Sequence, residues 1–364
     1  MRTLVVSDLH FGTIAGVDLL RRAAVRETLI ERLDRDIDRL VVLGDCLEFR
    51  ETPVAHAVEH AIPFLREVGQ VVDEIILAGG NHDHQLVGGW TEQFTEPLGL
   101  EHRIPPADAG PIPHRLADAA KPARLELTYP GIWLREDVYG HHGHYLDLHT
   151  TVPTIERLAA GSMSRLISPI PQHGAVPADY EAALAPLYAW MFALAQWSKD
   201  SVARAGSKSS SRAWSALAGP GRRKQPVRAL ALTAALRTGT AAFNRAGVGP
   251  LNPRLSGAVL RQGSLYGIGD AMRRLGVDAP YVLFGHTHRS GPWPVDDPAE
   301  WITPTGSQLM NTGSWVYQRH FLGNGSGDGP YWPGTAIVVD ESGPPRLERL
   351  LADRTHDQLR PDPA

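Results

Sequence analysis

Five short clusters of metal-ligand residue types recur along this chain of 364 residues. In chain order they are Asp8-Leu9-His10, Gly44-Asp45, Gly79-Gly80-Asn81-His82-Asp83, His141-His142-Gly143-His144 and Gly285-His286-Thr287-His288. Their carboxylate, amide and imidazole groups favour Mn, Fe, Zn or Ni over Ca or Mg, and we take Mn as the first expectation. The set is large enough for two adjacent divalent cations, so the sequence indicates a metal-dependent enzyme.

Most of the clusters directly follow a short apolar run of the kind that forms a buried strand. These runs are Leu4–Val6, Leu40–Leu43, Ile75–Ala78 and Tyr281–Phe284. Between the first three runs, Val17–Leu33 and Thr52–Val68 show the helical spacing of apolar residues. Strands that alternate with helices predict an α/β sheet flanked by helices, in which ligands at the carboxyl ends of neighbouring strands share one edge.

The remaining segments of the core have weaker patterns. We expect a surface loop over Pro105–Pro122, because Pro, Ala and Asp dominate it. Strands are predicted over Leu125–Thr128 and Ile132–Leu134. Near the C-terminus, Asn311–Ser314 and Ala336–Val339 are expected to form strands of a second sheet.

An insertion separates the fourth cluster from the fifth. Between Thr150 and Gln262 the chain has 14 Lys and Arg against 4 Asp and Glu, although the net charge of the whole chain is -4. This asymmetry favours either a surface that meets anions or an Arg-rich solvated helical face. Because both ends of the insertion return to the sheet near the site, we predict a cap over the substrate; the alternative is a subdomain without a role at the site.

The predicted domains are a core of residues 1–149 and 265–352, a basic helical cap of residues 150–264 and a loose tail of residues 353–364.

The single cysteine, Cys46, excludes an intramolecular disulfide and fits a reducing cytoplasm. The N-terminus lacks a charged leader with an apolar signal core, since Thr3–Ser7 already has the pattern of a strand. The longest dense apolar stretch, Leu184–Trp197, is about 14 residues long and falls short of the roughly 20 that span a bilayer. We therefore expect a cytoplasmic protein without a transmembrane segment, in which this stretch could still lie on a membrane surface.

Together, the clusters resemble the motifs of the calcineurin-like metallophosphoesterase family. That pattern, Asp-x-His, Gly-Asp-x-x-Glu, Gly-Asn-His-Asp, His and Gly-His-x-His, is met by Asp8-Leu9-His10, Gly44-Asp45-Cys46-Leu47-Glu48, Gly80-Asn81-His82-Asp83, His142 and Gly285-His286-Thr287-His288. The resemblance covers roughly residues 1–150 and 265–340 and leaves the basic insertion outside. It implies an α/β fold with a two-sheet β-sandwich flanked by helices in four layers.

Carried over residue by residue, the resemblance implies two metal sites that share Asp45 as a bridge. The first would be held by Asp8, His10, Asp45 and His288, and the second by Asp45, Asn81, His142 and His286. Independently of any family, two cations roughly 3.5–4 Å apart would acidify a bridging water and clamp phosphate oxygens for in-line attack. His82 is then the candidate proton donor to the leaving oxygen, with Asp83 fixing its tautomer, and the alternative for His82 is a structural role.

The fourth cluster contains three competing histidines. Neighbours in an extended segment point to opposite faces, so His141 and His142 cannot both face the metals, whereas His142 and His144 could. We choose His142, because the ligand of the family is commonly followed by Gly and Gly143 stands there. His141 and His144 remain alternatives, and His144 could contact substrate. Glu48, His149 and His173 are interpreted as structural residues or as residues that support the ligands from outside, not as ligands or catalytic residues.

The predicted reaction is hydrolysis of a phosphodiester, a pyrophosphate or a phosphomonoester. Within the family, the long insertion and Ser7-Asp8-Leu9-His10 look like the UDP-diacylglucosamine pyrophosphate hydrolases, which favours a lipid-linked or nucleotide substrate. That branch commonly has Arg in place of His82 and Asp in place of His144, and its insertion is shorter and less basic. An alternative is a nuclease, and a remote one is a non-catalytic scaffold. The residues that would serve a nuclease are Arg222, Arg223, Lys224 and Arg228 for phosphates, and Trp190, Trp197 and Trp214 for base stacking.

Overall fold

The computed structural model of the protein describes residues 1–150, 157, 169–197, 238, 240–241, 244–245, 251, 257–322 and 327–361. Much of the basic insertion is therefore not described. The predictions made for residues 222–228 and for Trp214 lie outside the described residues.

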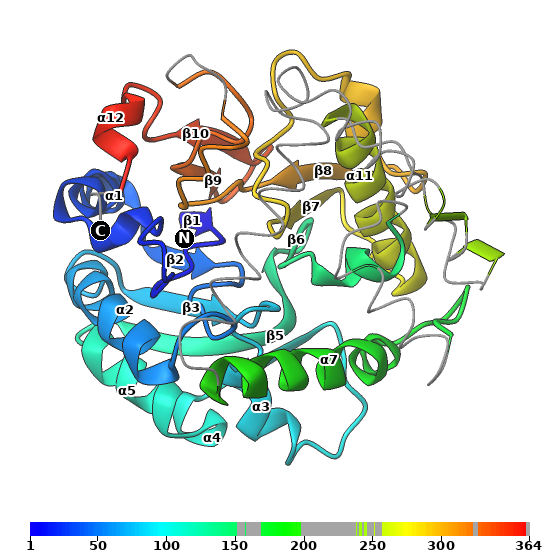
Figure 1. Ribbon diagram of the computed structural model, residues 1–364, viewed down its shortest axis with the longest axis horizontal. Coiled ribbons are helices and arrows are strands. Elements are labelled where there is room, and N and C mark those ends of the chain that lie inside the picture. Colours follow the sequence, from blue (N-terminus) through cyan, green and yellow to red (C-terminus); the bar gives the residue numbers. More distant parts are fainter. Residues whose placement is uncertain are drawn as a thin grey trace.

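A ten-stranded mixed sheet runs through the described part of the chain in the order β10-β9-β1-β2-β3-β5-β6-β7-β8, with β4 paired to β5 (Figure 1). Its strands are β1 (Thr3–Val6), β2 (Arg39–Val42), β3 (Glu74–Ala78), β4 (Glu101–Ile104), β5 (Arg124–Arg135), β6 (Val138–His141), β7 (Tyr281–Phe284), β8 (Gln308–Asn311), β9 (Thr335–Val339) and β10 (Arg346–Arg349). Strands β1, β2, β3 and the start of β5 are parallel, and so are β6, β7 and β8. The parallel arrangement places strand ends on the same edge.

Strand β5 joins the two halves of the sheet. Its residues 124–128 pair in parallel with β3, and its residues 131–135 pair antiparallel with β6. The two strands expected within this segment are thus one continuous strand. Apolar side chains from both halves, such as Val41 of β2 and Leu283 of β7, belong to one buried cluster. The two halves therefore pack face to face as a sandwich, as the sequence predicted.

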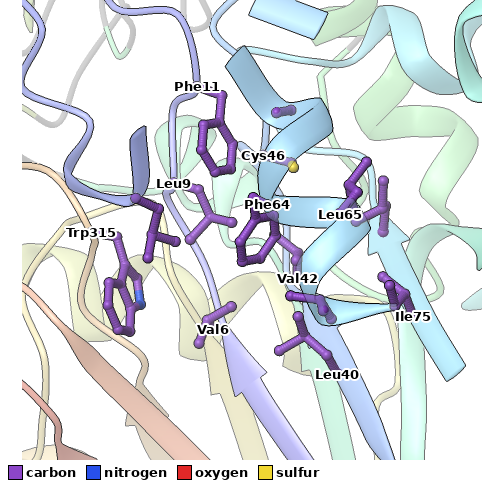
Figure 2. Close-up of a cluster of buried hydrophobic side chains, with 14 of the residues drawn as sticks. Val6, Leu9, Phe11, Leu40, Val42, Cys46, Phe64, Leu65, Ile75 and Trp315 are labelled. Carbon is purple, nitrogen blue, oxygen red and sulfur yellow. The ribbon is translucent and has the colours of Figure 1, made fainter. Parts of the chain in front are cut away.

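Helices cover the outer face of the first half. They are η1 (Leu19–Arg21), α1 (Ala23–Asp36), α2 (Val54–Val68), α3 (Gln85–Thr91), α4 (Pro106–Ala109) and α5 (Pro111–Ala120). Helix α2 carries buried residues three or four positions apart, and its Phe64 and Leu65 point toward Val42 and Ile75 of the strands (Figure 2). The Phe64 ring also lies 5.2 Å from the ring of Phe11, measured between centroids. Burial of this helix face anchors the loops that follow β1 and β2.

The second half of the sheet is covered by η2 (His144–Leu148), α7 (Pro177–Trp197) and α11 (Gly257–Arg274), with η3 (Pro298–Trp301) beside them. In Figure 1, α11 lies beside β7 and β8, on the side away from α1 and α2. Tyr188 of α7 and Ile268 of α11 are buried in the same apolar cluster. The order of layers is helix, sheet, sheet, helix, which confirms the predicted fold class.

Two segments that were expected to be irregular contain helices. The expected loop over Pro105–Pro122 contains α4 and α5, because prolines stand in their first turns, where a missing N–H costs no hydrogen bond. The expected loose tail contains α12 (His356–Leu359), in which Thr355 and Gln358 form a capping box and Leu359 is buried. Proline content and position near a terminus were therefore misleading for these two segments.

Two other differences concern boundaries and pairing. Strand β9 pairs antiparallel with β1 and so extends the first half of the sheet, not a second one. Helix α11 begins at Gly257, so the expected start of the core at residue 265 falls inside a helix. Within the described part of the chain, the structure has no helix with both the length and the apolar character of a membrane span.

Candidate metal centre

The predicted ligands stand where strands from both halves of the sheet end. They are Asp8 and His10 after β1, Asp45 after β2, Asn81 after β3, His142 after β6, and His286 and His288 after β7. Since β1, β2 and β3 are parallel neighbours and β6 is parallel to β7, these carboxyl ends meet. The structure thus brings all of these residues to one place.

The backbone of these ligands is unusual. In the described part of the chain, the residues other than glycine with positive φ are Asp8 (55°), His10 (49°), Asp45 (52°), His286 (66°) and His288 (56°). This left-handed conformation costs such residues on the order of 1–3 kcal/mol each. Strain that falls on ligand residues and on no other described non-glycine residue is typical of a functional site.

Glycines that precede the ligands leave room for ligands from other strands. A Cβ atom added at Gly44 would overlap the ring of His142, one at Gly80 would overlap the carboxylate of Asp45, and one at Gly285 would overlap the carboxylate of Asp8. Any larger residue at these positions would push a ligand out of place. The Gly-Asp, Gly-Asn and Gly-His pairs in the sequence therefore reflect close packing of the centre.

The first group of donor atoms contains Asp8, His10 and His288. Nε2 of His10 lies 3.1 Å from Nε2 of His288. Oδ1 of Asp8 is 3.2 Å from Nε2 of His288 and 3.8 Å from Nε2 of His10. These atoms all lie within 4.8 Å of one another, close enough to share one cation.

The second group contains Asp45, Asn81, His142 and His286. Oδ1 of Asn81 is 3.0 Å from Nε2 of His142 and 3.0 Å from Nδ1 of His286. Oδ2 of Asp45 lies 3.3 Å from Nε2 of His142, and it also lies 3.6 Å from Nε2 of His10 in the first group. Asp45 therefore stands between the two groups, in the position of a bridging carboxylate.

Each of the four ligand imidazoles has one ring nitrogen within the donor groups, called here the inner nitrogen, and one that points away from them, the outer nitrogen. Each outer nitrogen has a hydrogen-bond acceptor. The pairs are Nδ1 of His10 with Glu48 (3.0 Å), Nδ1 of His288 with Oε1 of Gln318 (3.2 Å), Nδ1 of His142 with the carbonyl of Leu43 (2.9 Å) and Nε2 of His286 with Oδ2 of Asp147 (3.0 Å). When the outer nitrogen donates its proton to these acceptors, the inner nitrogen carries a lone pair. All four inner nitrogens belong to the two groups of donor atoms.

The chemistry of the donor set fits divalent cations. Oδ1 of Asp8 is buried and has no hydrogen-bond donor in the described structure. The side-chain oxygen of Asn81 likewise faces only acceptors. Burial lowers the pKa of His142, but neighbouring Asp45 raises that pKa more strongly, to about 9, so the pocket favours positive charge. Lone pairs this close repel one another unless positive charge, either a proton or a metal ion, lies between them.

Among the three histidines of the fourth cluster, His142 faces Asp45 and Asn81. His141 instead accepts the N–H of Gly143 at Nδ1 (2.9 Å), and burial lowers its pKa to about 3. His144 is fully buried, and neither of its ring nitrogens has a hydrogen-bond partner in the described structure. Neither His141 nor His144 belongs to the groups of potential ligand atoms.

His82 forms a further group of potential ligand atoms with His10 and Asp45, and its hydrogen-bond partner is not the predicted one. Nδ1 of His82 is 2.8 Å from Oε2 of Glu48, and its side chain is 26% exposed. Asp83 is buried and accepts the N–H of Gly80 (2.8 Å) and of Leu47 (3.1 Å). The role expected for Asp83 is therefore wrong, because its carboxylate stabilises the loop backbone, and Glu48 takes its place at His82.

Glu48 bonds both His10 and His82, so it supports these side chains from outside the donor groups, as one of its two interpretations expected. Two other residues of the centre were not assigned from the sequence. Asp147 and Gln318 belong to no motif, and nothing in the sequence distinguishes them from other polar residues. Only the folded chain brings them to the outer nitrogens of the imidazoles.

No family model and no curated protein matches the chain. Similar solved structures include the nuclease MPE of Pseudomonas putida (21% identity over 38% of this chain and 53% of that chain, TM-score 0.22). A metallophosphoesterase of Sphaerobacter thermophilus is 11% identical over 93% of this chain and 82% of that chain, with a TM-score of 0.28. The phosphopantetheinyl hydrolase of Mycobacterium tuberculosis is 12% identical over 86% of this chain and 89% of that chain, also with a TM-score of 0.28. The chain spans about half the length of the nuclease. With TM-scores this low, these likenesses carry no argument about function.

The fourth cluster supplies a test with a matched control. We expect His142→Ala to reduce bound Mn from two ions to about one per chain, because it removes an inner nitrogen of the second group. His141→Ala removes an equally buried imidazole from the neighbouring position, so it should retain both ions. Mass spectrometry of the metal content of the folded fraction measures the difference. Equal loss of metal in the two variants would contradict the assignment of His142.

Proposed function

We propose that the protein is a metal-dependent phosphoesterase, with two divalent cations held by the two groups of donor atoms. The observation that supports this most directly is the convergence of lone pairs from seven side chains of both halves of the sheet. The proposed ligands are Asp8, His10, Asp45 and His288 for one cation and Asp45, Asn81, His142 and His286 for the other. Mn is the first metal to test. A non-catalytic scaffold would be expected to have lost ligands, and none of the seven is lost.

Two bound cations supply an acidified water and Lewis-acid contacts to phosphoryl oxygens. The chain itself contributes positioning. Glu48, Gln318 and Asp147 hold imidazoles through their outer nitrogens, and this fixes both the tautomer and the direction of each ring. The site is thereby arranged before a substrate binds, which lowers the reorganisation needed during the reaction.

His82 is the proposed proton donor to the leaving oxygen. Its Nδ1 bonds Glu48, and this carboxylate favours the charged form of the ring, but burial outweighs that effect and lowers the pKa of His82, so the ring releases its proton more readily than a free imidazole does. Its backbone N–H donates to Oδ1 of Asp45 (2.8 Å), so the ring is fixed beside the proposed bridging ligand. Nε2 is then the atom that can deliver the proton, and the ring is partly open to solvent and substrate.

The central test is hydrolysis of a generic aryl phosphodiester by Mn-loaded protein. We expect Asp45→Asn to abolish activity, because an amide lacks the negative charge that both cations need. Asp73→Asn changes an exposed carboxylate just before β3 and should leave the rate unchanged. Activity of the Asp45 variant equal to that of the unaltered protein would refute the bridging role, and inertness of the metal-loaded protein on mono-, di- and pyrophosphate substrates would refute the enzyme.

The role of His82 can be separated from a merely structural one by the leaving group. We expect His82→Gln to lower kcat by about 10²–10⁴-fold for an alkyl phosphoester, whose leaving oxygen needs a proton. For a nitrophenyl ester, which leaves without protonation, the same variant should lose much less. A similar loss with both esters would mean that His82 acts only as a structural residue.

The exposed face of α7 favours a lipid-linked substrate within this class. From Ala182 to Trp197 its exposed residues are Ala182, Pro186, Ala189, Trp190, Ala193, Leu194 and Trp197, and none is charged. Trp190 is 62% exposed and Trp197 is 90% exposed, so neither ring anchors the helix by packing in the interior. An apolar helix face with tryptophans is typical of contact with lipid. The exposed rings would also suit base stacking in a nuclease, for which the basic residues lie outside the described part.

Liposome flotation tests the lipid contact. We expect the protein to float with vesicles that contain anionic lipid, and the double variant Trp190→Ser with Trp197→Ser to remain in the soluble fraction. Val295 is 86% exposed outside α7, so Val295→Ser controls for a general loss of surface hydrophobicity. If the unaltered protein stays wholly soluble, the membrane contact is refuted while the phosphoesterase proposal stands.

A further inference from the structure

Arg50 is a cation beside the metal centre that the proposed ligand set does not use. It lies in the loop between β2 and α2, and its Nη1 is 2.6 Å from the side-chain amide of Asn81. Its buried Nε has no hydrogen-bond partner in the described structure. Among the described residues, no carboxylate forms an ion pair with its guanidinium. A half-buried arginine without a counter-charge is a binding group for an anion.

Asn81 cannot satisfy Arg50 and a cation with the same oxygen. In the present orientation the oxygen faces His142 and His286, and the amide nitrogen faces Arg50. If the amide were rotated, its oxygen would accept a hydrogen bond from Arg50, and its N–H groups would donate to the inner nitrogens of His142 and His286. When the oxygen serves a cation, Arg50 therefore loses its nearest acceptor, and an acceptor from outside the chain has to replace it.

A second unpaired group stands next to Arg50. Tyr188 of α7 is 3% exposed, its hydroxyl has no hydrogen-bond partner in the described structure, and its ring lies 5.8 Å from the guanidinium carbon of Arg50. Burial raises the pKa of Tyr188 well above its usual value, so the phenol keeps its proton and can donate it in a hydrogen bond. A buried hydroxyl without an acceptor costs stability unless a ligand supplies one.

Helix α7 also fixes the loop that carries Arg50. The amide nitrogen of Gln196 donates to the carbonyls of Phe49 (3.3 Å) and Thr52 (3.2 Å), and its oxygen accepts the N–H of Val54 (3.2 Å). The guanidinium of Arg50 additionally contacts the sulfur of Met191. The side chain of Arg50 is thus held between the loop and α7, which lowers the entropy that it would lose on binding an anion.

We propose that Arg50 and Tyr188 form an anion subsite that binds the oxygens of the reacting phosphoryl group that the cations do not hold. The proposal rests on the proposed function and deepens it, because it gives the inserted helix α7 a direct contact with the substrate. The ligand class is a tetrahedral phosphate anion. Arg50 donates charge-assisted hydrogen bonds to it, and Tyr188 donates a neutral one.

Titration calorimetry of Mn-loaded protein with inorganic phosphate tests the subsite. We expect Arg50→Gln to weaken phosphate binding by about 10–100-fold and Tyr188→Phe by about 2–10-fold, in line with charged and neutral hydrogen bonds. Arg66→Gln removes an exposed arginine from α2 and should bind phosphate like the unaltered protein. The Mn content of every variant is measured alongside, and it should stay unchanged because neither residue is a ligand.

The outcomes separate the subsite from the function. If Arg50→Gln retains both Mn ions and binds phosphate as tightly as the unaltered protein, the subsite is refuted even when hydrolysis is observed. If phosphate binding depends on Arg50 while no phosphoester is hydrolysed, the subsite stands and the proposed function fails. Retained phosphate affinity in Tyr188→Phe would remove Tyr188 from the subsite, and the part of the proposal that concerns α7 would be refuted with it.

Discussion

Repulsion between lone pairs is the constraint on which this structure depends. Two carboxylates, one amide oxygen and four imidazole nitrogens converge, and two of these atoms, Oδ1 of Asp8 and the side-chain oxygen of Asn81, face no hydrogen-bond donor in the described structure. Five of the ligands also hold a left-handed backbone, at roughly 1–3 kcal/mol each, which together is comparable to the whole stability of an ordinary domain. The two packed sheet halves hold this arrangement, and a ligand that binds only the folded state offsets its cost.

The sequence predicted the centre better than its surroundings. Apolar runs such as Leu40–Leu43 and Ile75–Ala78 are short, buried and followed by ligands, so local pattern and final position agree. Asp83 was misassigned because the turn after β3 determines where its side chain points. In that turn its carboxylate accepts hydrogen bonds from backbone N–H groups and not from His82. The acceptor role of Asp147 depends on β7 docking beside β6, and no local pattern contains that information.

Helix α7 is attached to the rest of the described structure by polar as well as apolar contacts. Glu181 accepts hydrogen bonds from the hydroxyls of Tyr129 (2.5 Å) and Tyr145 (2.7 Å) and lies 2.9 Å from Nε2 of His84. Buried polar networks of this kind fix one orientation more sharply than apolar packing does. The orientation that results turns Tyr188 toward Arg50 and leaves Trp190 and Trp197 exposed. One helix thereby connects the candidate metal centre to an apolar outer surface.

Donor residues that lie close together in the fold are far apart in the sequence, and this separation affects when the centre can form during synthesis. His10 and His288 are 278 positions apart, yet their Nε2 atoms lie 3.1 Å from each other. During synthesis the first strands emerge long before β7, and domains generally fold as units. A nascent or truncated chain that ends before residue 286 contains Asp8, His10 and Asp45 but lacks both histidines of the fifth cluster. The proposed cation sites are thus completed only in chains that have been translated past residue 288.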